Sequence, residues 1–340
     1  PFRRQRQMCI RDSITTLDYK AQVKANEAIL KNLKAWGLTR DKNQAAVFSF
    51  SPIDGRILVY AGGKDYTKSQ YDRVTQSARP SGSAFKPFIY TAAIEKGYSP
   101  NDMIDDLPFK AGDWTPRNYG NKYRGPIPLY TALMVSSNVC TARLMDAIGV
   151  RPVIQLARVM GITTPIPYDY TISLGSNSVK LFEMTRAYGV FANGGFKVEP
   201  FAIERIESSR GTILYEAKKA RSSKVLNLNT AATMTAIMKT VITNGTGRAA
   251  HRGRPPLERR FHRERARLPR VGLVGRSRRA RTADRNLRDQ HGARPAQTGT
   301  TDRRARRRLG EPDRRSATAS AGCTSDLAHV LLRHRSLLLL

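Results

Sequence analysis

The amino-acid usage changes abruptly near residue 250, and this change limits where the chain can build a folded core. Residues 251–340 contain 24 Arg but no Lys, Tyr, Trp, Ile or Met, and Phe261 is their only aromatic residue besides histidine. This stretch shows no sustained helical or strand periodicity, so it cannot bury enough apolar surface to offset the entropy lost on folding. We therefore expect the core to lie before residue 250 and residues 251–340 to be disordered or misfolded.

A shift of reading frame accounts for this composition better than a functional basic segment does. A G+C-rich gene that is translated in the wrong frame yields the excess of Arg, Pro, Ala and Gly found here. At the other end, residues 1–13 resemble a translated sequencing adapter, and we exclude them from the fold prediction as a non-native leader.

The formal net charge of +32 is divided evenly between the two parts of the chain, because residues 251–340 carry 24 basic and 8 acidic residues. Such a surplus suggests nucleic acid or an anionic surface as a partner. No stacking aromatic residues alternate with the arginines, so we expect no specific nucleic-acid partner. The remaining charge fits a protein that works against anionic lipid or wall polymer, or simply solvated lysine faces.

The chain contains no stretch of about eighteen apolar residues, which is the length that a membrane-spanning helix requires. Cys9, Cys140 and Cys323 lack the spacing of disulfide partners or metal ligands, and we expect no metal or cofactor. Cys140 is predicted to be a buried thiol.

The hydrophobic pattern predicts strands around a helical cluster. The expected elements are a strand and a helix within 14–38, paired strands 45–51 and 56–62 joined by the turn 52–55, helices 84–96, 139–160, 178–192 and 229–243, and a hairpin of 201–206 with 213–216. Residues 101–128 are polar and rich in Gly, Pro and aromatic residues, and we interpret them as a loop that rims a cleft or as an ordinary surface loop.

A serine and a lysine stand three residues apart at the start of the helix expected over residues 84–96. Pro80 and Gly82 interrupt the preceding chain, which places Ser83 at the helix N-terminus and Lys86 nearly one turn later on the same face. Lys86 can then accept the proton of the Ser83 hydroxyl, while the helix N-terminus favours negative charge beside it. Because this spacing also arises by chance on solvated faces, the prediction of a nucleophile needs a second motif.

The second motif is Ser136-Ser137-Asn138, which precedes an apolar-periodic stretch over residues 139–150. A hydroxyl at this place can pass a proton to a leaving amine, and an Asn side chain can hold a substrate amide by donating and accepting at once. Ser and Asn are also favoured helix N-caps, so a structural role for the triplet remains open. Ser-x-x-Lys, a Ser-x-Asn type triplet and Lys-Thr-Gly form the motif set of penicillin-binding proteins and class A β-lactamases, and two of the three occur here in order.

Eight segments of the chain form a recognisable series. They are residues 15–18 (TTLD), 62–66 (GGKDY), 70–73 (QYDR), 82–88 (GSAFKPF), 116–119 (PRNY), 136–139 (SSNV), 174–176 (LGS) and 244–250 (NGTGRAA). With this series, residues 14–250 resemble the transpeptidase half of a class A penicillin-binding protein. The resemblance implies an α/β fold of the serine D,D-transpeptidase and β-lactamase type, with an antiparallel sheet, flanking helices and a mainly helical subdomain.

The resemblance also implies roles for four residues. Ser83 would be the acylated nucleophile, Lys86 its general base, Ser136 a proton relay and Asn138 the contact to the substrate amide. The implied activity is peptidoglycan cross-linking by a D,D-transpeptidase, through a serine acyl-enzyme formed on D-Ala-D-Ala stem peptides. β-Lactams such as penicillin would acylate the same serine.

Members of this family carry the domain after a membrane anchor and a glycosyltransferase domain, and neither occurs in these 340 residues. The implied location is the extracytoplasmic face of the bacterial inner membrane, on the periplasmic and cell-wall side. We divide the chain into a leader (1–13), a linker or domain start (14–44), an incomplete transpeptidase domain (45–250) and an out-of-frame, disordered segment (251–340).

The third motif of the family is missing from the sequence. A Lys-Thr-Gly strand is expected soon after residues 244–250, where it would supply a cation for the substrate carboxylate and an N–H for the oxyanion hole. Gln297-Thr298-Gly299 lies far later and is treated as a coincidence. Codons exist for residues 255–260 that would make the neighbouring frame read Pro-Ala-Ala-Gly-Lys-Thr.

Besides the transpeptidase, two alternatives stay open: a D,D-carboxypeptidase of the same fold, which would use water, and a non-catalytic truncated product or basic chain that binds wall polymer or nucleic acid.

Overall fold

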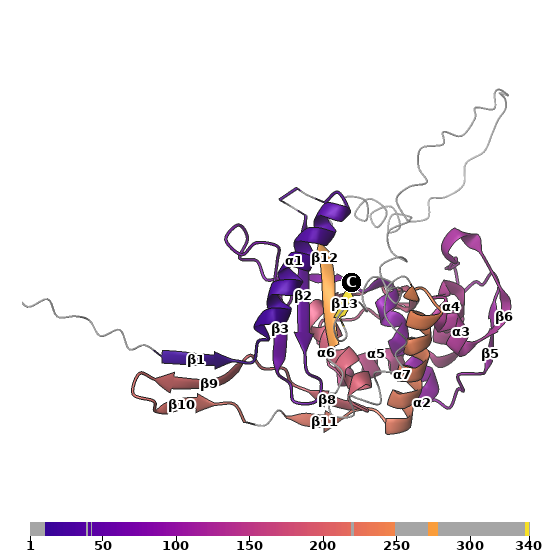
Figure 1. Cartoon of the computed structure of the whole chain (residues 1–340). Helices are drawn as coiled ribbons and strands as arrows, with labels where there is room; N and C mark the ends of the chain where they lie inside the picture. The colour runs from indigo at the N-terminus through magenta and orange to yellow at the C-terminus, as the bar shows by residue number, and fades with distance from the viewer. Residues whose placement is uncertain are drawn as a thin grey trace, which may run out of the picture.

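The computed structural model of the chain describes residues 11–38, 40–41, 43–218, 221–248, 271–277 and 337–339. Within these residues a sheet covered by helices lies beside a larger helical cluster, and a hairpin arm extends from the far side of that cluster (Figure 1). The mixed architecture of antiparallel strands and a mainly helical part agrees with the fold class expected from the sequence. None of the helices in this part of the chain is long and apolar enough to cross a membrane.

A four-stranded sheet forms the first layer. Across the sheet its strands are β13 (Leu337–Leu339), β12 (Val271–Ser277), β2 (Gln44–Phe50) and β3 (Ile57–Ala61). β2 is antiparallel to both of its neighbours, so that Phe48 lies opposite Tyr60 on one side and Leu273 on the other. The β2–β3 pair confirms the paired strands that the sequence predicts around the turn 52–55.

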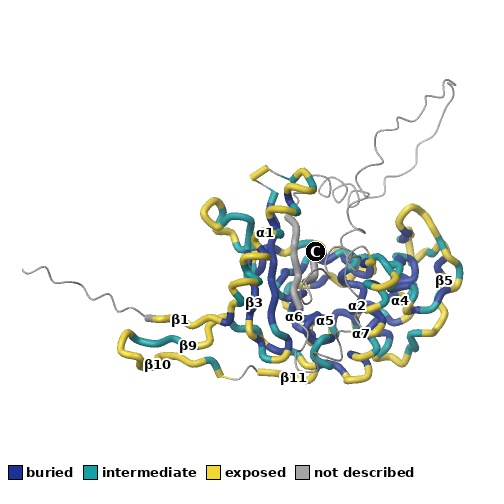
Figure 2. Tube along the Cα trace, in the orientation of Figure 1, coloured by how far each residue is buried: buried dark blue, intermediate teal, exposed yellow. Residues whose placement is uncertain are grey.

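β2 is buried along its whole length, whereas the sequence pattern predicts alternation between an inner and an outer face. The reason is that both faces of the strand are covered. Helix α1 (Tyr19–Ala35) packs Ile29 and Leu33 against Val47 on one face, and the larger core covers Phe48 on the other. Figure 2 shows β2 as a continuous dark-blue segment between α1 and α6.

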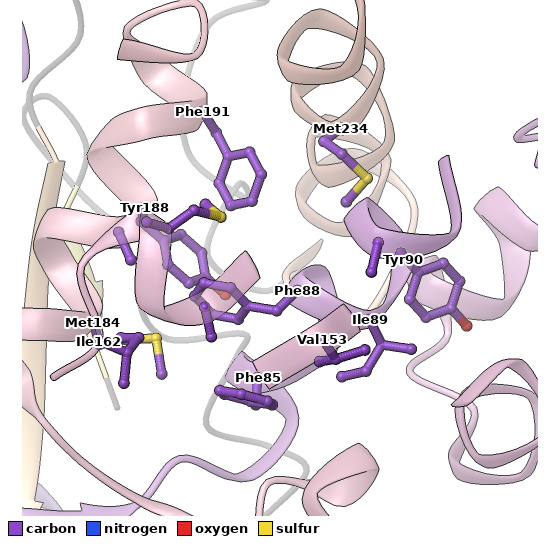
Figure 3. Close-up of a cluster of buried hydrophobic side chains, with 14 of the residues drawn as sticks. Phe85, Phe88, Ile89, Tyr90, Val153, Ile162, Met184, Tyr188, Phe191 and Met234 are labelled. Atoms are coloured by element: carbon purple, nitrogen blue, oxygen red, sulfur yellow. The ribbon is translucent and has the colours of Figure 1, made fainter. Parts of the chain in front are cut away.

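The helical cluster forms the second layer and surrounds one central helix. Its helices are α2 (Lys86–Glu95), α3 (Leu129–Met134), α4 (Asn138–Ile148), α5 (Val150–Met160), α6 (Leu181–Ala192) and α7 (Leu228–Thr243). Every residue of α2 from Lys86 to Ala93 is buried. Figure 3 shows the aromatic side chains around it, where the Phe88 ring lies 6.3 Å from Tyr188 and 6.4 Å from Phe191 between ring centroids. The position of α2 is therefore fixed from all sides.

Three of the predicted helices have different bounds. The single helix expected over residues 139–160 is divided into α4 and α5 at Gly149, whose φ of 82° is incompatible with a continuous right-handed helix. The helix expected from residue 178 begins at Leu181, because β7 (Ser178–Lys180) pairs with β4 (Ala78–Pro80). The helix expected from residue 84 begins at Lys86, after the 3₁₀ turn η1 (Gly82–Phe85).

Two smaller sheets lie near the N-terminal end of the fold. Their strands are β1 (Arg11–Thr15), β9 (Ile203–Ser208) and β10 (Ile213–Glu216) in one sheet, and β8 (Phe196–Val198) and β11 (Ser222–Lys224) in the other. The β9–β10 pair confirms the predicted hairpin. β1 starts inside the stretch 1–13 that we expect to be a non-native leader. Its ladder to β9 is made by backbone groups, which pair without regard to side-chain identity.

Residues 101–128 form a hairpin arm, and the expectation of a plain loop is corrected. β5 (Met103–Asp106) pairs antiparallel with β6 (Gly125–Pro128), and the short turn η2 (Tyr119–Asn121) lies between them. The segment returns on itself because the backbone N–H of Arg124 donates to the carbonyl oxygen of Asp106. The arm is visible at the edge of the cluster in Figure 1.

In the stretch 251–340, where we expect disorder, the structure describes two short strands, β12 and β13. The expectation of disorder is therefore wrong for residues 271–277 and 337–339. The physical reason is that the edge of β2 offers backbone N–H and C=O groups on which a strand can form, whatever its side chains. The rest of the predicted disordered segment lies outside the described residues, as does most of the predicted leader.

Candidate active site

Ser83 lies in the 3₁₀ turn η1, directly before the buried helix α2, and is itself half-buried. Hydrogen bonds to backbone groups hold this turn on both sides of Ser83. The N–H of Gly82 donates to the carbonyl of Gly175 at 2.9 Å, and the hydroxyl of Tyr188 donates to the carbonyl of Ala84 at 2.8 Å. The neighbours of Ser83 on each side are thus bonded to other segments, and the serine hydroxyl is held at one place.

The contact between Gly82 and Gly175 leaves no room for a side chain. A Cβ atom on Gly175 would lie 1.9 Å from the carbonyl oxygen of Gly82, and the φ of Gly175 is +75°. Gly175 belongs to the segment 174–176 and directly follows the 3₁₀ turn η3 (Tyr170–Leu174). The backbone of Gly175 therefore supports the turn that carries Ser83.

Replacing Gly175 with alanine is expected to push Gly82 and Ser83 away from their positions. We expect a lower unfolding temperature and a fall, on the order of 10²-fold, of the acylation rate that the family resemblance implies for Ser83, because small displacements of reacting groups have effects of that size. The matched control is Gly211→Ala, since Gly211 has a φ of +76° with nothing within 4 Å of its Cβ position. Equal losses in both variants would show that backbone strain alone, and not the contact with Gly82, explains the effect.

The amine of Lys86 is fully buried and points at the Ser136-Ser137-Asn138 segment. Its Nζ lies 2.7 Å from the carbonyl oxygen of Ser136, 3.0 Å from the Ser136 hydroxyl, 3.3 Å from the carbonyl oxygen of Ser137 and 2.7 Å from Oδ1 of Asn138. The structure thus brings the two sequence motifs together, although about fifty residues separate them in the chain.

Ser136 lies between the lysine and the first serine. Its hydroxyl is 3.1 Å from Oγ of Ser83 and 3.0 Å from Nζ of Lys86. Ser136 has a φ of 58°, a left-handed conformation that is uncommon for a residue with a side chain and is frequent at functional sites. These contacts form a continuous hydrogen-bonded path from Ser83 through Ser136 to Lys86.

Within Ser136-Ser137-Asn138, only Ser137 has the structural role of a helix N-cap. The hydroxyl of Ser137 accepts the backbone N–H of Cys140 at 3.1 Å and caps helix α4. Asn138 instead uses its side chain across the site, since Oδ1 accepts from Lys86 and Nδ2 donates to the carbonyl of Arg117 at 2.9 Å. A carboxamide has two donor hydrogens and two acceptor lone pairs, so capacity for a further partner remains.

Two residues of the site were not predicted from the sequence. Asp106 is completely buried, and Asn118 is nearly so. Both contact the Ser136-Ser137-Asn138 segment from the hairpin arm, with Oδ1 of Asn118 2.9 Å from the N–H of Asn138. The only sequence signal was the segment 116–119, whose place in the family resemblance marks it without indicating what Asn118 does.

The prediction of a buried thiol at Cys140 is confirmed, because this free cysteine is fully buried in α4. Burial raises the pKa of the Cys140 thiol from 9.0 to about 12, and the nearby Asp106 adds to the shift. The folded state therefore holds the neutral thiol. Its contribution to stability is complete below pH 9.0 and is lost as the pH rises toward about 12, because the unfolded thiol ionises first.

Cys140 is accordingly expected to resist alkylation in the native protein. With Cys9 and Cys323 replaced by serine, iodoacetamide at pH 8 should leave the folded chain unmodified and should modify Cys140 rapidly in denaturant, because only the thiolate reacts. Intact-protein mass spectrometry measures both rates. Equal rates with and without denaturant would contradict the buried position.

The sequence offers no Lys-Thr-Gly to complete the site, and Gln297-Thr298-Gly299 lies outside the described residues. In the described part of the chain, no group of His, Cys, Asp or Glu side chains is arranged to hold a metal ion. The chemistry that the geometry supports there is proton transfer between a serine, a second serine and a buried lysine, next to an amide side chain.

Comparison with known proteins identifies a family for this part of the chain. The Transpeptidase family, described as the penicillin binding protein transpeptidase domain, matches residues 45–257. The chain is 38% identical to penicillin-binding protein 1A of Pseudomonas aeruginosa over 185 residues, which are 52% of this chain and 22% of that protein.

Solved structures agree with the sequence match. Penicillin-binding protein 1A from Haemophilus influenzae is similar with a TM-score of 0.59 and 28% identity, over 62% of this chain and 38% of that chain. The PonA1 protein from Mycobacterium tuberculosis in complex with penicillin V is similar with a TM-score of 0.63 and 25% identity, over 70% of this chain and 66% of that chain.

The chain spans about a quarter of the length of the curated relatives that it matches. The family match covers more than half of the 340 residues and includes both motifs of the site. Together with the fold, this match shows that the chain belongs to the penicillin-binding protein transpeptidase domain family.

Proposed function

We propose that the domain is a serine D,D-transpeptidase that acts on the D-Ala-D-Ala end of peptidoglycan stem peptides. The observation that carries the proposal is the hydrogen-bonded path from Ser83 through Ser136 to the buried amine of Lys86, with Asn138 beside it. In this proposal Ser83 is the nucleophile, Lys86 the general base, Ser136 the proton relay and Asn138 the contact to the substrate amide.

The partners of Lys86 determine how the proton moves. Of the four oxygen atoms around Nζ, two are backbone carbonyls and one is the Asn138 amide oxygen, and all of these only accept hydrogen bonds. The Ser136 hydroxyl is the one partner among the four that can also donate. When Lys86 is neutral, its lone pair can therefore accept a proton from Ser136, while Ser136 takes the proton of Ser83.

The first half-reaction forms an ester. Oγ of Ser83 attacks the carbonyl carbon of the penultimate D-Ala as its proton passes to Lys86. The C–N bond to the terminal D-Ala then breaks, and the proton returns through Ser136 to the nitrogen of the leaving D-Ala. Enzyme and substrate are joined as an acyl-enzyme, and one free D-Ala is released.

The second half-reaction returns the enzyme. The amine of a neighbouring stem peptide attacks the ester carbonyl and loses a proton to the relay, and Ser83 regains its hydroxyl as the new amide cross-link forms. Water in place of the amine would give the D,D-carboxypeptidase reaction. A β-lactam would acylate Ser83 in the same first step, as its ring C–N bond opens. The penicillin V complex of the similar PonA1 protein supports this part of the proposal.

We also infer the setting of the domain from its relatives. The similar proteins carry the name penicillin-binding protein 1A, and the chain covers about a quarter of them. The full-length protein is proposed to be anchored at the extracytoplasmic face of the bacterial inner membrane and to carry a glycosyltransferase domain. Its partners there are the stem peptides of the wall, with β-lactams as inhibitors.

The proposal is tested by incubating the purified chain with a fluorescent penicillin and mapping the adduct by mass spectrometry. We expect one adduct, on the peptide that contains Ser83. A second chain, with the reading frame restored after residue 250, serves as the comparison. An adduct in neither chain would overturn the proposal. An adduct in the restored chain alone would assign the reaction to the in-frame protein and would show the present chain to be inactive.

A further inference from the structure

We propose that Asp106 and Asn118 are positioning residues, which hold the Ser136-Ser137-Asn138 segment in the geometry that serves Lys86 and Ser83. The inference rests on the proposed function, because it gives these two residues a part in the acylation step. Neither residue is assigned to touch the substrate.

Asp106 is a buried acceptor with several donors around it. Its Oδ1 accepts Nδ2 of Asn118 at 2.6 Å and the hydroxyl of Ser137 at 2.7 Å, and the thiol of Cys140 lies 3.7 Å away. Its Oδ2 accepts the N–H of Arg124 at 3.2 Å and pairs with the Arg124 guanidinium at 3.7 Å. A carboxyl group that is 0% exposed is stable only with such partners, so its place is strictly defined.

Asn118 connects this carboxyl group to the backbone of the site. Its Oδ1 accepts the N–H of Asn138 at 2.9 Å and that of Val139 at 3.2 Å, which are two of the unpaired donors at the start of α4. Its Nδ2 donates to Asp106 and, at 2.9 Å, to the carbonyl of Lys122. Since both ends of the carboxamide are occupied, the side chain is fixed in one orientation.

The hairpin arm is itself attached to α4 at a second point. The guanidinium of Arg143 donates to the carbonyl of Pro108 at 3.2 Å and lies 4.5 Å from the centre of the Phe109 ring. Asp106 and Asn118 are thus carried by a segment that contacts the helix at more than one place. This attachment makes them suitable as a rigid support.

Asp106 and Asn118 act on the reacting groups through the segment that directly surrounds the amine of Lys86. Ser136 O, Ser137 O and Asn138 Oδ1 are three of the oxygens around Nζ of Lys86, and all three belong to the segment that Asn118 and Asp106 hold. Ser136 has a left-handed φ of 58°, a conformation that persists only where its surroundings maintain it. Loss of the support would allow Ser136 and Asn138 to move away from Lys86.

The test separates positioning from mere stability. For the wild type and for Asn118→Ala, we measure the acylation step k2, the binding constant Ks for a fluorescent penicillin, and the fraction of protein that is labelled. We expect k2 to fall on the order of 10²-fold in Asn118→Ala, with a smaller change in Ks. A purely structural role would lower the labelled fraction and leave k2 of the labelled molecules unchanged, which would overturn the inference. Asn101→Ala, on the exposed start of the same arm, is the matched control.

A compensating pair provides the second test. Asn118→Asp sets two carboxyl groups against each other and is expected to lose k2 as severely as Asn118→Ala. Adding Asp106→Asn restores an N–H···O bond between positions 106 and 118 and keeps an oxygen facing the N–H groups of Asn138 and Val139. We expect the double variant to regain about tenfold in k2 over Asn118→Asp, the change that one hydrogen bond produces. A double variant no better than the single one would contradict the inference.

Amide hydrogen exchange tests the positioning without any reaction. In Asn118→Ala the N–H groups of Asn138 and Val139 should exchange about tenfold faster than in the wild type and in Asn101→Ala. Unchanged exchange would overturn the inference even if penicillin reacts. If penicillin labels neither the present chain nor the chain with the restored reading frame, faster exchange would still support the positioning by Asn118, while the proposed acyl transfer would be refuted.

Discussion

Replacing Ser83 with alanine is expected to abolish covalent labelling of the chain by a fluorescent penicillin. Ser83 lies directly before helix α2, and its hydroxyl is bonded to Ser136 on the path to Lys86. An alanine at this position has no hydroxyl and cannot form the ester. The fold should be retained, because the lost contact is a single 3.1 Å hydrogen bond to Ser136 at a half-buried position. Such a bond contributes about 1 kcal/mol to stability. Labelling and the unfolding temperature are measured on the same preparation.

The control for this substitution is Ser81→Ala. Ser81 lies two residues earlier and bonds the carbonyl of Gly175 and Oδ1 of Asn177, each at 3.4 Å, with no contact to Lys86 among them. Labelling should persist in this variant. If Ser83→Ala were labelled as well as the wild type, the assignment of the nucleophile would be wrong, and peptide mapping would identify the residue that carries the adduct.

Replacing Lys86 with methionine is expected to have the second largest effect. The change removes the base and leaves the carbonyl oxygen of Ser136 and Oδ1 of Asn138 without this buried donor, while the carbonyl oxygen of Ser137 keeps its hydrogen bond from the Thr141 hydroxyl. General-base catalysis is typically worth about 10²–10⁴-fold, and we expect the acylation rate to fall within this range. The unsatisfied oxygens should also destabilise the fold, by about 1–3 kcal/mol for each buried group that finds no water. Stopped-flow acylation and chemical denaturation measure the two effects.

Two further variants sharpen this prediction. Lys86→Arg should not restore the rate, since a planar guanidinium stays charged and cannot accept the proton of Ser136. Lys96→Met removes an amine from the other end of the same helix, where it bonds the carbonyl of Ile148 at 2.6 Å. That variant should acylate at the wild-type rate. A fast reaction in Lys86→Arg would exclude Lys86 as the base.

Local sequence patterns predicted most of the fold. The β9–β10 hairpin and the paired strands β2 and β3 follow from signals within a few residues, and helix α7 was placed within one residue of its start. The errors arose where tertiary contacts decide. The strand β7 was read as part of a helix, because only its pairing with β4, about one hundred residues earlier, makes it a strand.

In the candidate site, too, local patterns were predicted and tertiary contacts were missed. The three-residue spacing of Ser83 and Lys86 placed them in one site, and it predicted a direct approach of the amine to the hydroxyl. The hydrogen bonds of the structure instead connect the two residues through Ser136, a link that helical geometry does not predict. Ser136 and Asn138 were connected to them only by the family resemblance. Asp106 and Asn118 were missed because a buried carboxyl group and a buried amide look like any polar residues of a Gly- and Pro-rich segment. Their hydrogen bonds to α4 appear only when the arm has folded back.

The return of the hairpin arm to Asp106 has a consequence for how members of such a family can diverge. The strands β5 and β6 pair up to Asp106, where the N–H of Arg124 bonds both the carbonyl oxygen and Oδ2 of Asp106. Residues 110–116 lie beyond the contacts of Pro108 and Phe109 with Arg143 of α4 and before Asn118. Doubling the length of a flexible loop costs only about 0.6 kcal/mol when its ends are already fixed. Insertions after residue 109, beyond the contacts of Pro108 and Phe109 with Arg143, can therefore accumulate and give the domain new surfaces for wall polymers or partner proteins, while the geometry around Ser83 is inherited unchanged.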